Sequence, residues 1–84
     1  MRTRVKICGL TRPDDVNFSV RAGADALGFV FYKPSPRYVS PEIARGLISL
    51  VPAWVSTVGL FVNSSYDEIL QVIDHVGVSH VQLH

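Results

Sequence analysis

A short apolar run around residue 28 is the feature that most restricts the fold of this chain. Ala26-Leu27-Gly28-Phe29-Val30-Phe31 contains no polar side chain. A strand of this length without polar alternation is typical of a parallel sheet that is covered on both faces. The sequence before and after the run shows the same alternation of strand-like and helix-like segments.

Three more strands are predicted, at residues 5–8, 57–62 and 80–84. Three helices separate the four strands, with starts expected at Thr11, Ser40 and Ser65 and ends at Gly23, Pro52 and Gly77. Ser65 and Glu68 have the spacing of a capping box. The predicted order is therefore β-α-β-α-β-α-β.

Two α/β architectures have this order of elements. A doubly wound sheet normally carries a glycine-rich phosphate loop after its first strand, whereas the turn here, 8–12, has a single glycine. The (β/α)8 barrel of the TIM type has eight such units in about 250 residues. The favoured fold class is α/β, with residues 1–84 forming about the first half of one barrel domain and no internal domain boundary.

Composition excludes several classes of function. The net charge of +1, with both signs scattered, offers no basic stripe for nucleic acid. No apolar run reaches the roughly 18 residues that span a bilayer, and patterned sequence follows Met1 at once, so neither a membrane segment nor a signal peptide is expected. The single cysteine cannot form an internal disulfide, which fits a cytoplasmic protein and disfavours a redox thiol protein.

Side chains that can take part in catalysis or binding lie where the predicted strands end. In a parallel barrel these ends lie on one side, so Cys8, Arg37, Asn63 and His84 are expected around one mouth. Asn63 is assigned to shaping its loop rather than to catalysis. A cysteine thiolate can act as a base or nucleophile, although a lone cysteine is more often a small buried hydrophobe.

Alternation along the strands predicts which side chains face the barrel interior. Lys6 shares a face with Cys8, where its ammonium would favour the thiolate and would need a carboxylate. Two sources of that carboxylate stay open: Asp25, the nearest acidic residue to a strand start, or a residue outside these 84. On the last strand His80, Gln82 and His84 would face inward, and Val81 and Leu83 would pack under helices. His75, His80 and His84 lack the spacing of a metal site, so none is expected.

Five motifs in this order resemble phosphoribosylanthranilate isomerase, a (β/α)8-barrel family of tryptophan biosynthesis, over the first half of that family. They are Val5-Lys6-Ile7-Cys8-Gly9-Leu10-Thr11, then the segments 23–31, 35–41 and 58–63, and finally Val81-Gln82-Leu83-His84. The resemblance implies an Amadori rearrangement of N-(5-phosphoribosyl)anthranilate without a cofactor. It implies that Cys8 is the general base, that Arg37 binds the anthranilate carboxylate, and that His84 lies beside the substrate.

The resemblance also implies that the general acid and the phosphate site belong to later strands, outside these 84 residues. The isolated chain is therefore expected to be inactive or nearly so. Two alternatives stay open. One is a non-catalytic half-barrel that self-associates through its open sheet edges. The other is a different sugar-phosphate barrel enzyme with a thiol base.

Overall fold

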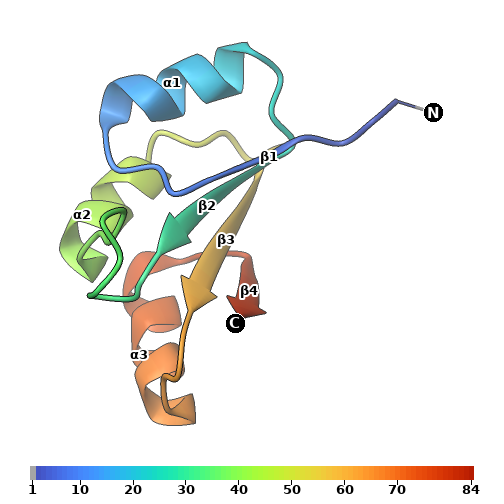
Figure 1. Ribbon diagram of the computed structural model, residues 1–84. Coiled ribbons are helices and arrows are strands. Elements are labelled where there is room, and N and C mark those ends of the chain that lie inside the picture. Colours follow the sequence, from blue (N-terminus) through green and yellow to red (C-terminus); the bar gives the residue numbers. More distant parts are fainter. Residues whose placement is uncertain (1) are drawn as a thin grey trace.

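The protein is described by a computed structural model that covers residues 2–84 (Figure 1). Four strands alternate with three helices, as the sequence predicts. In chain order the elements are β1 (Lys6–Cys8), α1 (Pro13–Arg21), β2 (Ala26–Val30), α2 (Pro41–Ile48), β3 (Ser56–Phe61), α3 (Tyr66–Val76) and β4 (His80–Leu83).

The four strands form one parallel sheet in the order β1-β2-β3-β4. Figure 1 shows all three helices on the same side of this sheet. The other side, which we call the open face, carries Lys6, Cys8, Gly28, His80 and Gln82. A curved parallel sheet with its helices outside is the arrangement of a barrel segment, which confirms the predicted fold class.

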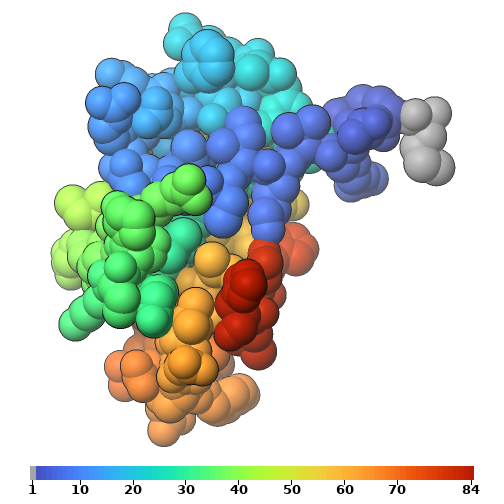
Figure 2. Space-filling model, in the orientation of Figure 1, coloured from blue at the N-terminus to red at the C-terminus, as the bar shows by residue number. Residues whose placement is uncertain are grey.

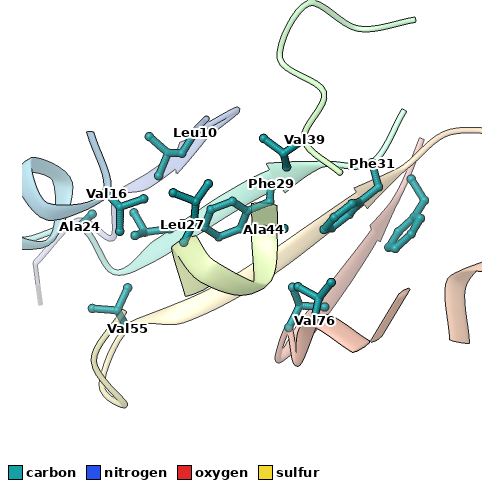
Figure 3. Close-up of a cluster of buried hydrophobic side chains, with 13 residues drawn as sticks. Leu10, Val16, Ala24, Leu27, Phe29, Phe31, Val39, Ala44, Val55 and Val76 are labelled. Carbon is teal, nitrogen blue, oxygen red and sulfur yellow. The ribbon is translucent and has the colours of Figure 1, made fainter. Parts of the chain in front are cut away.

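The hydrophobic core lies between the sheet and the helices (Figure 3). Leu27 and Phe29 of β2 are completely buried there, as are Val16 of α1 and Ala44 of α2. Burial of a valine, leucine or phenylalanine side chain contributes about 1.5–3 kcal/mol. Because both faces of β2 are covered, its apolar composition needs no polar alternation.

The helix starts agree with the sequence at two of three positions. Ser40 accepts a hydrogen bond from the backbone N–H of Ile43, and Ser65 forms the full capping box with Glu68. Thr11 as the N-cap of α1 is wrong: Arg12 holds that position without a side-chain cap. Because Pro13 is the first helical residue, the residue before it is extended and takes the cap position.

Two further expectations differ from the structure. α2 ends at Ile48, ahead of Pro52, because residues 49–51 continue as a turn. Val81 and Leu83 were expected under helices, but 40% and 70% of these side chains are exposed. The reason is that no helix follows β4 within residues 2–84. None of the helices in this range is long and apolar enough to cross a bilayer.

Asp25 joins the segment before β1 to the start of β2. Its carboxylate accepts a hydrogen bond from the Val5 backbone N–H at 2.7 Å and forms an ion pair with Arg2. The Arg2 hydrogen bond, and then the Val5 N–H, lower the pKa of Asp25 below its usual value. Asp25 therefore binds the N-terminal segment and not Lys6, which rules out one of the two sources of a carboxylate considered for Lys6.

Replacing Ser65 by alanine should lower the stability of the chain, because the Ser65 hydroxyl can no longer accept from the Glu68 backbone N–H at the start of α3 or donate to the Glu68 carboxylate. The expected cost is about 1 kcal/mol. It corresponds to a melting temperature about 4–8 °C lower. Ser64→Ala is the matched control, since Ser64 makes only a 3.5 Å contact with the Val62 carbonyl. Equal melting temperatures for the two variants would contradict the assignment.

The Asp25 carboxylate should make stability depend on pH. A carboxyl group with a lowered native pKa adds stability above its unfolded pKa, about 3.9, and this is lost as pH falls through the native pKa. Wild type should therefore exceed Asp25→Asn in stability at pH 7, with the difference shrinking below about pH 4. Urea unfolding across this range measures the difference, with Asp74→Asn as the charge control. A difference that stays constant with pH would refute the prediction.

Candidate functional site

Cys8 ends β1 on the open face, and its thiol is exposed. Its partner in the neighbouring strand is Gly28. A methyl group on Gly28 would lie 2.8 Å from the Cys8 sulfur and 3.2 Å from its Cα. No ordinary side chain fits there, so the absence of a side chain at Gly28 leaves the space that the Cys8 thiol occupies.

The turn after Cys8 brings Arg37 to the same place. Gly9 has φ +86°, a conformation that glycine adopts readily. The N–H groups of Gly9 and Leu10 both donate to the Gly28 carbonyl, at 3.0 and 3.2 Å. The aliphatic part of the Arg37 side chain packs directly on Gly9, where a Cβ would collide with it. Arg37 follows Cys8 by 29 residues in the sequence. In the structure its side chain packs on Gly9, the residue directly after Cys8.

The loop that carries Arg37 folds back onto the end of β2. The Arg37 N–H donates to the Ser35 hydroxyl at 3.1 Å, and Tyr38 N–H donates to the Ser35 carbonyl at the same distance. Val39 N–H then donates to the Val30 carbonyl at 3.0 Å. These bonds fix the backbone on both sides of Arg37. None of the ion pairs within residues 2–84 involves Arg37, so its guanidinium can bind an anion.

Lys6 and Gln82 connect the first and last strands across the open face. The Lys6 ammonium donates a hydrogen bond to the Gln82 side-chain carbonyl. Figure 2 shows the blue N-terminal strand and the red C-terminal strand in contact. The expectation that both side chains face inward is confirmed, but the partner of Lys6 is an amide rather than a carboxylate. Lys6 is exposed, so its charge carries no large desolvation penalty that would demand a carboxylate.

His84 and Asn63 lie at the ends of the other two strands. The His84 N–H donates to the Phe61 carbonyl at 3.0 Å, so the backbone of His84 continues the ladder of β3 and β4. Asn63 has φ +53°, a left-handed conformation that suits its predicted role in shaping the loop. The four strand ends therefore occupy one edge of the sheet, and the Arg37 side chain packs on Gly9, the residue that directly follows Cys8.

The remaining histidines have local partners. His75 lies 3.3 Å from Glu42, which links α3 to α2, and the His80 ring is 3.0 Å from the Ser79 hydroxyl. No group of three histidine, cysteine or acidic side chains gathers into a possible metal site anywhere in residues 2–84. The chemistry available at this edge of the sheet is thus a thiol, a guanidinium and an imidazole.

Sequence reasoning missed the two glycines as parts of the site, and it missed Gln82 as the partner of Lys6. Gly28 was assigned only to an apolar strand, and Gly9 only to a turn. Because neither glycine has a side chain, Gly28 leaves room for the Cys8 thiol and Gly9 leaves room for the Arg37 side chain. A signal for Gly28 does exist in the sequence: a glycine interrupts an otherwise bulky strand, which indicates close approach of another group.

The geometry agrees with known proteins. A sequence model of the N-(5'-phosphoribosyl)anthranilate (PRA) isomerase family matches residues 5–84. The Acinetobacter calcoaceticus N-(5'-phosphoribosyl)anthranilate isomerase is 55% identical over the whole chain. A phosphoribosyl anthranilate isomerase in complex with reduced 1-(o-carboxyphenylamino)-1-deoxyribulose 5-phosphate superposes with a TM-score of 0.96 and 52% identity, over 99% of this chain and 43% of that one.

A third relative is the dimeric phosphoribosylanthranilate isomerase from Thermotoga maritima, determined as mutually generated monomers. It superposes with a TM-score of 0.94 and 51% identity, over 99% of this chain and 42% of that one. The chain spans 39% of the length of the Acinetobacter relative. By sequence and by fold, this chain belongs to the phosphoribosylanthranilate isomerase family.

Proposed function

We propose that the chain is the N-terminal part of a single-domain (β/α)8-barrel enzyme, a phosphoribosylanthranilate isomerase that works in the cytoplasm. The reaction would be the Amadori rearrangement of N-(5-phosphoribosyl)anthranilate, an aminoaldose, to the corresponding 1-deoxyribulose 5-phosphate. The observation that carries this proposal is the packing of the Arg37 side chain on Gly9, the residue next to Cys8. A base and an anion-binding group at the same turn can act on one small substrate.

Cys8 is the proposed general base. After the sugar ring opens to a protonated Schiff base, its thiolate removes the proton from C2. The C2–H electron pair forms the C1–C2 double bond of an enolamine, and the iminium nitrogen becomes neutral. Exposure of Cys8 on the open face supports this role, because the thiol can reach a ligand there.

Arg37 is the proposed partner of the anthranilate carboxylate. A guanidinium presents a planar fork that matches a planar carboxylate through two hydrogen bonds. The loop bonds around Ser35 and Val30 hold its backbone, which reduces the entropy lost when the substrate binds. His84 is proposed as a second group beside the substrate. The general acid and the phosphate site are proposed to lie outside these residues.

Self-association is a second proposal, favoured by the exposure of Val81 and Leu83 on β4. An edge strand with apolar, uncovered side chains is an interaction site for another chain. Without the later part of the barrel, this edge would bind a second copy. Light scattering on the isolated chain tests this, since a monomer at micromolar concentration would exclude it.

Activity can be tested by grafting. Residues 1–84 are joined to the remaining part of the Acinetobacter calcoaceticus relative, and turnover is followed by the loss of anthranilate-adduct fluorescence. Cys8→Ala should lower kcat by about 10²–10⁴-fold, the usual contribution of a general base. Arg37→Lys should mainly raise KM, because an ammonium cannot form the two-bond fork. Arg45→Lys, exposed on α2, is the matched control. A grafted barrel that is folded by circular dichroism but inactive would overturn the proposal.

Gly28→Ala tests how Cys8 is positioned. The added methyl group would displace the thiol, and displacement of a catalytic group by about 1 Å can cost on the order of 100-fold in rate. In the grafted barrel we expect kcat to fall about 10- to 100-fold with a smaller change in KM. The alkylation rate of Cys8 by iodoacetamide should change as well. Gly46→Ala is the control, since nothing lies within 4 Å of its added Cβ. Normal kcat in Gly28→Ala would show that Cys8 tolerates the displacement or is not the base.

A further inference from the structure

A hollow lies on the helix side of the sheet, whereas Cys8 lies on the open face. It has a volume of about 280 Å³ and lies between the loop after β2, the loop after β3 and α3. The residues that line it are Phe31, Lys33, Tyr38, Pro41, Phe61, Ser64, Glu68 and Val72. Small-molecule sites are usually about 300–1,000 Å³, so this hollow suits a ligand with one ring and a short polar part.

The floor of the hollow is aromatic. Phe31 and Phe61 stack with ring centroids 5.3 Å apart and an interplanar angle of 25°. Phe31 lies at the opposite end of the core from Val16 (Figure 3). Both rings are nearly buried, at 9% and 2% exposure, and Val72 adds an aliphatic side. A planar apolar group can therefore pack on the floor without moving the core.

The rim carries two opposite charges. Within residues 2–84, the Lys33 ammonium has neither an ion-pair partner nor a hydrogen-bond acceptor. One Glu68 oxygen accepts from Ser65, which leaves the second oxygen for a ligand. A ligand that carries both a carboxylate and an ammonium complements these two charges. The hydroxyls of Tyr38 and Ser64 add neutral hydrogen-bonding groups.

We propose that this hollow binds an aromatic α-amino acid. The side-chain ring would pack on Phe31 and Phe61, the α-carboxylate would pair with Lys33, and the α-ammonium would pair with Glu68. Every residue that lines the hollow lies between the end of β2 and α3. The proposal does not depend on the isomerase activity, because the hollow and the Cys8 site lie on opposite faces of the sheet.

Binding of L-phenylalanine tests the proposal by titration with two-dimensional NMR or calorimetry. The isolated chain and the grafted barrel are both used, so that poor folding of the isolated chain does not prevent the test. We expect saturable binding in the millimolar range, with shifts of the Lys33, Tyr38 and Glu68 amide resonances. Phenethylamine, which lacks the carboxylate, and 3-phenylpropionate, which lacks the ammonium, should each bind more weakly.

Two variants locate the ligand. Lys33→Met should weaken phenylalanine binding about two- to fivefold, as expected for an exposed ion pair, and should leave phenethylamine binding unchanged. Val72→Phe should fill the hollow and abolish binding. Arg45→Met removes an exposed cation elsewhere and should have no effect. The proposal is overturned by the absence of saturable binding, by equal binding of 3-phenylpropionate, or by equal effects of Lys33→Met and Arg45→Met.

Discussion

The whole structure depends on the burial of β2 from both sides. Toward the helices, Leu27 and Phe29 have no exposed surface, and the helices α1 and α2 contribute Val16 and Ala44 to the same core. Toward the open face, Gly28 is covered by the Cys8 side chain. A strand in this position must pair with a neighbour on each edge, because its buried backbone groups need hydrogen bonds. β1 and β3 supply those bonds.

This constraint couples the core to the candidate site. The Gly28 carbonyl accepts bonds from Gly9 and Leu10, so the turn after Cys8 is fixed by the same strand that anchors the core. This turn also positions Gly9, on which the Arg37 side chain packs. The chemistry-bearing residues are therefore held by backbone hydrogen bonds and close packing rather than by bonds between their own side chains. Such a site is rigid before a ligand arrives, which lowers the entropy cost of binding.

Local rules predicted most of the fold and failed at identifiable places. The strand and helix order, the capping box at Ser65 and the helix end at Gly23 follow from short-range chemistry, and the structure has them. Thr11 was the wrong N-cap because Pro13 sets the first helical residue. Lys6 was assigned a carboxylate on the ground of desolvation, yet on an exposed face an amide from β4 is sufficient. The N-cap was changed by a neighbour in the sequence, Pro13, and the partner of Lys6 by a residue on another strand, Gln82.

The sequence by itself determined the parallel α/β class, the family and the residues able to do chemistry, because apolar periodicity and motif order are properties of the chain alone. Only the tertiary structure decided which of these residues meet. Arg37 lies against Gly9, Lys6 reaches Gln82, and the Phe31 and Phe61 rings stack on the opposite side of the sheet. The physical reason is that these contacts depend on strand register and on the space left by glycines. Register and close packing arise only when distant segments are held together in three dimensions.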